Sequence, residues 1–296
     1  MKRVAEIRFP QSANLFQFCK KILDHKFGSI RIIDQDVGQI LGYDPADCSH
    51  WKKGKKNVRS IYSMKAIAEH LGVDEQLVVD VAAGGLNANE GFFEFNGYGT
   101  FEADARFFEN IRKESLKKNV PWSKNSELQL RQATEEAFKK IDQIVAEIHS
   151  KTQILEAPVY LPEVFAHYPA IKYQTVETLK NKDVEASVSS QGLDLVCQKS
   201  NEVRPHVRFQ IARSLAQYFL LDLLKETESK HQEVGTRLNE IYSNQFAARL
   251  LTPKFLIQKE IQSVDISKDI VLQLSERFWV SKHFLNRRLK EALQNL

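Results

Sequence analysis

The chain has 296 residues, of which 43% are hydrophobic and 27% charged, and its formal net charge is +4. This composition excludes an intrinsically disordered chain, and the mild positive charge permits nucleic-acid binding without requiring it. No apolar run is long enough to span a membrane, and residues 1–12 lack the apolar core of a signal peptide. The cysteines Cys19, Cys48 and Cys197 are scattered and odd in number, so we expect reduced thiols and a cytoplasmic protein.

The length suffices for two or three domains, and the element patterns predict a mainly helical protein with a small β-sheet, the α+β class. The glycine pair at 84–85 marks a break in the chain. We expect a first domain over residues 1–84, an aromatic-rich linker over 85–125, a second domain over 126–255 and a C-terminal helical subdomain over 256–296.

Residues 12–84 predict a bundle of short helices that end at glycines. Asp44 is placed to cap the third helix, with Pro45 at its first position, and Asp74 is placed to cap the fifth. The first helix is expected before a connector over residues 26–33, and the others over residues 34–41, 45–53, 61–71 and 75–81.

This order of helices resembles the XRE (Cro/C1-type) helix-turn-helix family of DNA-binding proteins. Residues 36–43 (DVGQILGY) match the helix before the turn, residues 44–54 match the recognition helix, and residues 67–73 (IAEHLGV) match a later helix and turn. In the family the recognition helix enters the major groove of DNA, whereas we expect Cys48 and Trp51 to face the core. The base contacts implied by the resemblance are Ala46, Asp47, Ser49 and His50.

A basic run follows that helix, with five positive charges in eight residues: Lys52, Lys53, Lys55, Lys56 and Arg59. Placed there, the run favours phosphate contacts and salt-dependent DNA binding over the alternative of a solvated loop. His50 fits an exposed bystander nearly as well as a contact. Asp47 would repel phosphates, unless it accepts a hydrogen bond from a cytosine amino group.

Residues 90–108 are rich in aromatic side chains: Phe92, Phe93, Phe95, Tyr98, Phe101, Phe107 and Phe108. So much apolar surface needs a partner, so we expect it to pack the first domain against the second or to pair two chains. A ligand-stacking surface is the alternative.

A long helix is predicted over residues 126–149, with an apolar face that includes Leu128. Core packing is its expected role, and dimerisation is the alternative. Three short strands are then predicted over residues 171–176, 184–188 and 193–198, with Gly192 turning between the last two.

The stretch PHVRFQIARSLAQYFL, residues 205–220, predicts a buried helix from Phe209 onward, entered from an extended segment. Arg213 and Gln217 are four residues apart, so they project from the same face, and Ser214 follows Arg213.

This stretch resembles the zinc-binding helix of the ImmA/IrrE metallopeptidases, which typically reads Arg-Phe-Thr-x-Ala-His-Glu-Leu-Gly-His-Tyr. The matching residues are Arg208, Phe209, Ala212, Leu215 and Tyr218. By the resemblance, Arg213 replaces the first zinc-binding His, Ser214 replaces the general-base Glu, and Gln217 replaces the second His.

A second stretch carries the same resemblance. Residues 240–253, EIYSNQFAARLLTP, are similar to the family's Glu-x-x-x-Asn-x-Phe-Ala-x-x-Leu-Leu-x-Pro, so Glu240 stands for the third zinc ligand. The three strands before residue 205 agree with the small sheet that precedes the metal helix in this family. An ordinary amphipathic core helix without peptidase ancestry is the alternative.

The substitutions have a chemical consequence. A catalytic zinc needs about three protein ligands, and the Glu between two His at i and i+4 activates the water. Arg cannot ligate a cation, Gln is a poor ligand and Ser is a poor base. We therefore expect a pseudo-peptidase with no catalytic residues, no cofactor and no metal, in which Arg213 takes the place of zinc and neutralises a buried Glu240. A metal site rescued by His206 or His231 together with Glu240 is the alternative.

The C-terminal segment is predicted as two helices, with Ser281 capping the second and Leu285, Leu289 and Leu293 on one face. Residues 277–281 and 288–289 are similar to a helix-turn-helix-like tail of the same family. Core packing is the expected role of this tail. The alternative is a second DNA contact through Arg287, Arg288 and Lys290.

Together, the two resemblances imply a bacterial transcription regulator that binds double-stranded DNA, as a homodimer on paired half-sites. Its pseudo-peptidase domain would act as a sensor or interaction module for a peptide, a small molecule or a protein. One alternative is a zinc peptidase that cleaves a partner repressor. The other is an antitoxin-like or phage-regulatory interaction factor that does not touch DNA.

Overall fold

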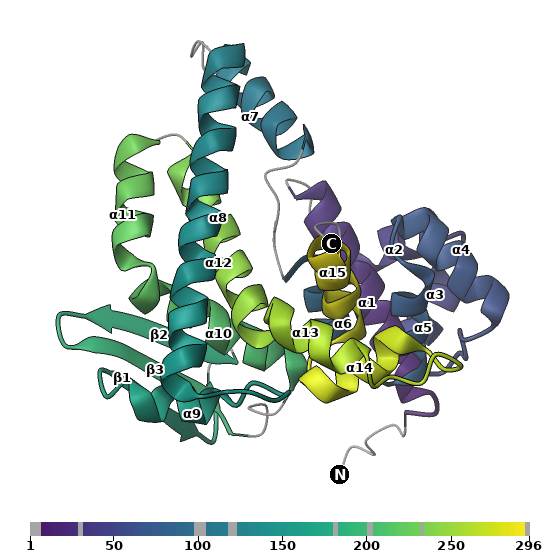
Figure 1. Ribbon diagram of the computed structural model, residues 1–296. Helices are drawn as coiled ribbons and strands as arrows, with labels where there is room; N and C mark the ends of the chain where they lie inside the picture. Colours follow the sequence, from purple (N-terminus) through teal and green to yellow (C-terminus); the bar gives the residue numbers. More distant parts are fainter. Residues whose placement is uncertain are drawn as a thin grey trace. The chain divides into compact units, whose positions relative to one another are not determined.

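The computed structural model describes residues 7–28, 32–97, 105–117, 123–179, 183–199, 204–231 and 234–293. The chain divides into two compact units, a first unit (Met1–Gly97) and a second unit (Tyr98–Leu296), and each is described by itself. The described residues are mainly helical with one three-stranded sheet, which confirms the predicted α+β class (Figure 1).

The first unit is a bundle of short helices, and the predicted caps of α3 and α5 are confirmed. The Asp44 carboxylate accepts the Asp47 backbone N–H, and the Asp74 carboxylate accepts the Gln76 and Leu77 backbone N–H groups. The elements are α1 (Pro10–Phe27), α2 (Asp34–Ile40), α3 (Pro45–Lys52), α4 (Ile61–Leu71), α5 (Glu75–Ala83), α6 (Ala88–Phe92) and the π-helix η1 (Phe93–Gly97).

Trp51 is the centre of the core of the first unit. Its side chain is fully buried, its indole N–H donates to the Ser12 carbonyl at 2.7 Å, and its ring meets the Phe16 ring edge-on at 5.3 Å between centroids. Cys48 is buried as well, which confirms that these two residues of α3 face inward. Because the only polar atom of the indole is satisfied, the ring is buried without a desolvation penalty.

Gly38 sets how closely α2 approaches α3. A Cβ at this position would lie 2.9 Å from the Cys48 Cβ and 3.0 Å from the Tyr43 carbonyl oxygen. The Cys48 thiol also donates to the Asp34 carbonyl at 2.7 Å. The two helices are therefore in backbone-level contact, and only glycine leaves the space for it.

The aromatic stretch is divided between the two units. Phe92 and Phe95 are half-buried against the core of the first unit, whereas Phe107 and Phe108 are buried in α7 (Ala105–Lys117) of the second. The division of the chain after Gly97 thus differs from the expected break at 84–85, because the Asn87 capping box starts α6, which packs on α1. Tyr98 and Phe101 lie outside the described residues.

The second unit is built around the packing of α10 on α12, and Figure 1 shows the long α8 running beside α12. Its further elements are α8 (Lys124–Thr152), α9 (Leu161–His167), β1 (Ile171–Val176), β2 (Val184–Ser189), β3 (Gly192–Gln198), α10 (Pro205–Phe219), α11 (Leu221–Lys230), α12 (Gly235–Leu251), α13 (Lys254–Ile261), α14 (Ile270–Phe278) and α15 (Lys282–Leu293).

Two helix predictions in this unit are wrong in detail. α10 begins at Pro205 rather than at Phe209, because proline is suited to the first helical turn and the segment before Phe209 is helical, not extended. On α8, Leu128 is 53% exposed, and the buried stripe begins at Leu130 instead. The apolar face of a helix, identified from sequence, does not show how far along the helix its packing partner extends.

The sheet has the strand order β1-β3-β2, with β1 parallel and β2 antiparallel to β3. Every second residue of β3 is buried, namely Leu193, Leu195 and Cys197, as expected for a strand with one covered face. Gly192 has φ +138°, and a Cβ there would lie 1.9 Å from the Ala170 carbonyl oxygen. The turn into β3 therefore requires glycine. All three strand positions confirm the prediction.

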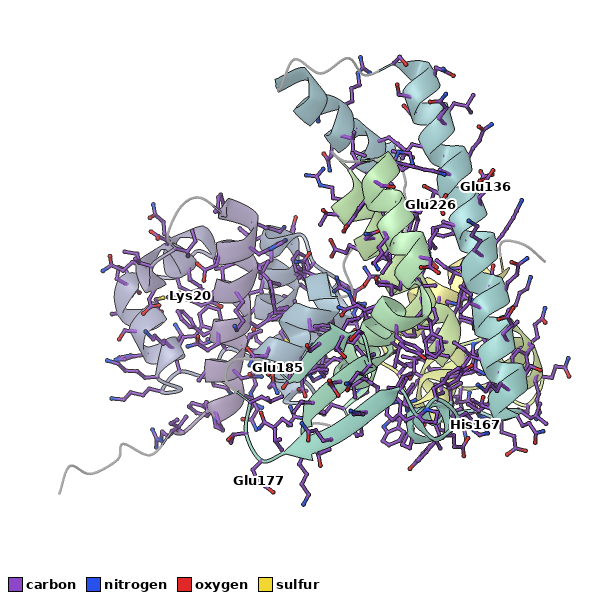
Figure 2. The ribbon with its side chains drawn as sticks, turned by 90° about the vertical axis from the view of Figure 1, so that its left-hand side faces the viewer. Lys20, Glu136, His167, Glu177, Glu185 and Glu226 are labelled. Atoms are coloured by element: carbon purple, nitrogen blue, oxygen red, sulfur yellow. The ribbon has the colours of Figure 1, made fainter. Side chains whose placement is uncertain are left out.

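Ion pairs lie on the surface of both units. Lys20 on α1 pairs with Asp34 at 2.8 Å, and Lys140 on α8 pairs with Glu226 on α11 at 3.7 Å; Figure 2 labels Lys20 and Glu226. Such exposed pairs contribute at most about 1 kcal/mol each, so buried apolar packing stabilises the fold. Among the described residues, no helix combines the length and the apolarity that a bilayer crossing requires.

The close approach of α2 and α3 can be tested with Gly38→Ala. The added methyl group has no space, so we expect the first unit to lose about 1–3 kcal/mol of stability. Hydrogen exchange of the α2 and α3 amides measures this loss separately from the second unit. Gly85→Ala is the matched control, because its Cβ would meet its nearest neighbour, the Asp80 carbonyl oxygen, only at 3.4 Å. Equal exchange in both variants would contradict the backbone-level contact.

Candidate functional sites

The outer face of α3 carries the four residues expected to contact bases. Ala46 and His50 are exposed and Asp47 and Ser49 are partly exposed, whereas Cys48 and Trp51 of the same helix are buried. All four residues are therefore at least partly accessible, as contact with a DNA groove requires.

Two of the five basic residues are already paired. Lys52 contacts Asp34, and Lys56 contacts Asp47. Hydrogen bonds from Lys20 and Lys52 hold the pKa of Asp34 below its usual value. The expected repulsion between Asp47 and phosphates is thus offset by Lys56, a partner that sequence reasoning did not identify.

The unpaired positive charge lies on three residues. Lys53, Lys55 and Arg59 are exposed and form no ion pair within the described part of the chain, although the Arg59 Nε donates to the Asn57 side chain at 3.0 Å. These three cations are therefore the ones available to phosphates.

Buried anchors fix the loop that carries them, residues 52–59. The Val58 backbone N–H donates to the Ser12 hydroxyl at 3.0 Å, and the Phe9 backbone N–H donates to the Gly54 carbonyl at 2.8 Å. Gly54 has φ +62°, and a Cβ there would lie 2.5 Å from an Ile7 side-chain carbon. Because both ends are tied to the body of the first unit, the backbone that carries Lys53 and Lys55 is held in place.

In the second unit, α10 and α12 bring Arg213 and Glu240 together. The Arg213 Nη2 lies 3.6 Å from the Glu240 Oε1. The side chains are 36% and 45% exposed, so the expectation of a buried Glu240 is wrong. The carboxylate lies on the outer edge of the helix pair, where water already solvates it, and the ion pair is correspondingly weak.

Ser214 and Gln217 complete what we call the 213–240 cluster (Arg213, Ser214, Gln217 and Glu240). The Ser214 hydroxyl donates to the Gln210 carbonyl of its own helix at 2.9 Å, and Gln217 is exposed. Tyr218 is half-buried, whereas most of the matched scaffold residues are buried: Arg208, Phe209, Ala212, Leu215, Phe246, Ala247, Leu250 and Leu251. The positions that agree with the family's motifs are thus mostly core positions, and those that differ are at the solvent boundary.

The 213–240 cluster does not fit a zinc ion. Its only carboxylate has a guanidinium 3.6 Å away, and that cation would repel a divalent metal while holding the one strong donor. His206, an alternative ligand, lies 3.4 Å from Asp183 through its Nε2. His231 has its pKa lowered by burial and by Lys230. Among the described residues, no group of three or more His, Cys, Asp or Glu side chains is placed to hold a metal.

The C-terminal helices confirm the predicted cap and correct one candidate. The Ser281 hydroxyl accepts the Phe284 backbone N–H at 3.1 Å, and Leu285 and Leu289 are buried. Arg288 is only 7% exposed, so it is wrong as a DNA contact, because α15 turns that side chain into the unit. Arg287 is exposed, and the Lys290 and Leu293 side chains lie outside the described residues.

Sequence reasoning placed Arg208 in the scaffold and missed its environment. Its side chain is 5% exposed, and its Nη2 donates to the Val159 carbonyl at 2.8 Å. A charged residue on the apolar face of a buried helix was the available signal, since such groups are rarely buried unless paired.

The weakness of the Arg213–Glu240 pair can be measured in a double-mutant cycle with Arg213→Gln and Glu240→Gln. We expect a coupling energy below about 1 kcal/mol, because solvent screens both side chains. The reference cycle is Arg249 with Asp142, whose Nε–Oδ1 distance is 2.6 Å and whose Arg is only 10% exposed. Its coupling energy should be the larger of the two in denaturant unfolding. The reverse order would contradict the solvent-boundary placement of the 213–240 cluster.

Comparison with known proteins agrees with this geometry. Residues 177–290 match the family model described as the IrrE N-terminal-like domain, which is labelled a peptidase family (Peptidase_M78). The match covers less than half of the chain, lies within the second unit and includes both α10 and α12. Neither the search of curated proteins nor the search of solved structures gave a match. The second unit is therefore similar to an ImmA/IrrE-type peptidase domain.

Proposed function

We propose that the chain is a DNA-binding transcription regulator whose peptidase-like unit lacks hydrolytic activity and acts as a sensor or interaction module. The observation that carries this proposal is the surface of α3. Its inner face is locked by Trp51, its outer face is polar, and the unpaired Lys53 and Lys55 follow directly. A helix of this kind, flanked by fixed cations, suits insertion into a major groove with the loop on the phosphates.

The electrostatics support a modest, local contact with DNA rather than a broad basic face. The chain's net charge is +4, and Asp34 and Asp47 neutralise part of the charge around α3. Fewer phosphate contacts mean that each copy of the chain binds DNA more weakly. Two copies on adjacent half-sites compensate for this loss. A homodimer is therefore part of the proposal.

The chemistry of the 213–240 cluster supports a non-hydrolytic role. Peptide hydrolysis of this type needs a metal-bound water and a general base. By the sequence resemblance, those positions correspond here to the guanidinium of Arg213, the hydroxyl of Ser214, which is bonded to its own helix, and the amide of Gln217. The peptidase-like unit then has binding as its remaining use, and a bound ligand can change DNA affinity only if it prefers one of two states of the chain.

DNA fragments selected from a genomic pool by the wild-type chain provide the substrate for the test. We expect Lys53→Gln with Lys55→Gln to weaken binding in a gel-shift salt series and to reduce the slope of log K against log salt by about 2, one for each lost phosphate contact. Lys139→Gln on α8, an exposed lysine of the second unit, is the matched control and should leave the slope unchanged.

If the wild-type chain selects no DNA, or if its binding does not depend on salt, the protein-interaction alternative replaces this proposal. If saturating the peptidase-like unit with its ligand leaves the affinity for DNA unchanged, DNA binding stands but the sensing role is excluded.

If substitutions at three positions removed zinc binding, reversing them should restore it. A variant with Arg213→His, Ser214→Glu and Gln217→His should bind one zinc per chain, because Glu240 already faces α10 and can supply the third ligand. Metal analysis after zinc loading and dialysis measures this. The same variant with Glu240→Gln should retain less zinc. Stoichiometric zinc in the dialysed wild-type chain would instead favour a zinc peptidase, the activity that the family label suggests.

A further inference from the structure

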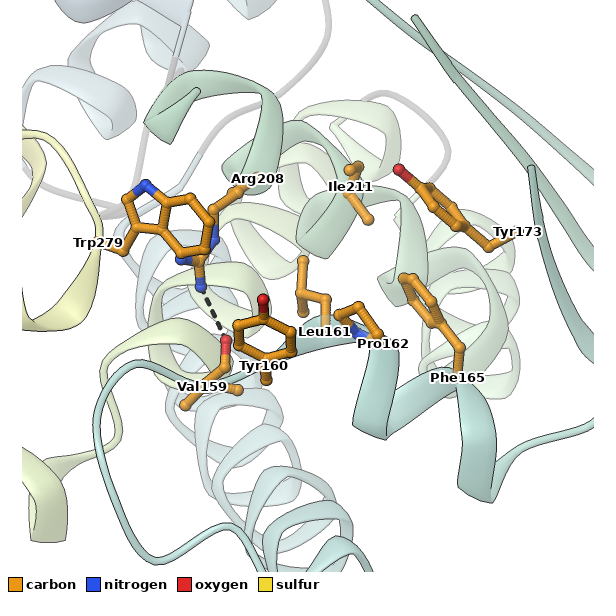
Figure 3. Close-up of a pocket in the computed structure, with 9 residues that line it drawn as sticks. All are labelled: Val159, Tyr160, Leu161, Pro162, Phe165, Tyr173, Arg208, Ile211 and Trp279. Atoms are coloured by element: carbon orange, nitrogen blue, oxygen red, sulfur yellow. Dashed lines mark hydrogen bonds between the residues drawn. The ribbon is translucent and has the colours of Figure 1, made fainter. Parts of the chain in front are cut away.

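A second feature of α10 lies away from the 213–240 cluster. A cavity of about 170 Å³ opens between α10, the start of α9, β1 and the residue that follows α14. Its walls are mainly aromatic and aliphatic, with Tyr160, Leu161, Phe165, Tyr173, Ile211 and Trp279. Arg208 is the one charged residue among those that line it, and none of the 213–240 cluster does so. Figure 3 shows Arg208 and Trp279 on one side of the cavity and Phe165 and Tyr173 on the other.

The guanidinium of Arg208 is buried without a counter-charge. Its Nη2 donates to the Val159 carbonyl, but its Nη1 is buried and has no hydrogen-bond partner among the described residues, and no carboxylate there pairs with it. Burial lowers the pKa of Arg208 to about 10, so the group is still protonated at neutral pH. A buried cation in this state is destabilising unless an anion completes its contacts.

Trp279 forms one wall of the cavity with its backbone in an unfavourable conformation. Its backbone has φ +53°, a region that non-glycine residues seldom adopt and that glycine normally supplies at the end of a helix. This geometry brings the indole ring 4.5 Å from the Arg208 guanidinium carbon, in a cation–π contact. The ring is thus a flat surface beside the one cation, and strain of this kind concentrates at ligand-binding positions.

We propose that the Arg208 cavity binds a small organic acid, with the carboxylate on the guanidinium and a flat apolar body against the aromatic walls. The size agrees, since a cavity of about 150 Å³ accommodates a benzene ring. A guanidinium is also a strong donor to a carboxylate, because a charge-assisted hydrogen bond is stronger than one between neutral groups. This inference does not depend on DNA binding or on the fate of the metal site.

The test uses the full chain with three probes: phenylacetate, its neutral analogue phenylacetamide, and acetate. We expect phenylacetate to bind at least about tenfold more tightly than phenylacetamide, which lacks the charge that Arg208 needs, and than acetate, which lacks the ring. Calorimetric titration, with ligand-observed NMR for the weak members, measures the three dissociation constants.

Two variants separate the proposal from a purely structural role of Arg208. Arg208→Gln removes the charge, and its shorter side chain also gives up the hydrogen bond to the Val159 carbonyl; it should abolish the preference for acid over amide. Trp279→Gly removes the wall while glycine keeps the positive φ without strain, so the chain should fold and lose about tenfold in affinity for phenylacetate. Arg213→Gln, outside the cavity, is the control and should bind phenylacetate as the wild type does.

No saturable phenylacetate binding at millimolar concentration, or equal affinities for acid and amide, would overturn the proposal. An acid preference that persists in Arg208→Gln would overturn it as well. Because none of these measurements involves DNA, a negative result leaves the proposed regulatory function untouched, and the failure of DNA selection leaves this site untouched.

Discussion

The packing of α10 on α12 is the constraint on which the second unit depends. Phe219 and Phe246 stack across this pair with ring centroids 5.7 Å apart, and Ala212, Leu215 and Ala247 are fully buried beside them. Small residues among the aromatic ones let the helix backbones approach closely. By the sequence resemblance alone, the zinc-binding positions of ImmA/IrrE peptidases correspond to residues that include Arg213 and Glu240, which are both partly exposed at the edge of this contact. Replacing ligands at an edge removes no apolar burial, so the scaffold can retain its fold with a different set of polar side chains.

The same separation between core and edge governs the first unit. Trp51 and Cys48 fix the inner face of α3, and Gly38 allows α2 to lie against it. The outer face of α3 contributes little to the core. Its net charge depends on ion pairs, because Asp34 pairs with Lys52 and Asp47 pairs with Lys56. A count of basic residues overstates the charge available to a polyanion, since carboxylates distant in sequence cancel part of it.

The limits of sequence reasoning follow from these contacts. Caps and breaks are local signals, so Asp44, Asp74 and Ser281 were identified correctly from neighbouring residues alone. Burial at an element's end depends on which helix covers it, and no local pattern contains that information. Leu128 was therefore predicted to be buried and is exposed, and Arg288, a DNA contact in the alternative interpretation of the tail, is buried as core packing requires. The Arg213–Glu240 contact was expected through the resemblance, but its exposure could not be, since it depends on how far α12 lies from the surface.

Two arginines of α10 show how position on one helix decides chemical use. Arg213 is exposed and has a carboxylate partner, so its charge is already compensated by Glu240 and by water. Arg208 is buried five residues earlier, where it contacts a carbonyl and an indole ring but no anion among the described residues. A buried guanidinium without a counter-ion has already lost its water, so an anion that binds to it displaces little further water. An anion should therefore gain more binding free energy there than at an exposed guanidinium that already has a carboxylate partner. A small anion that binds to α10 should therefore bind at Arg208 rather than at Arg213.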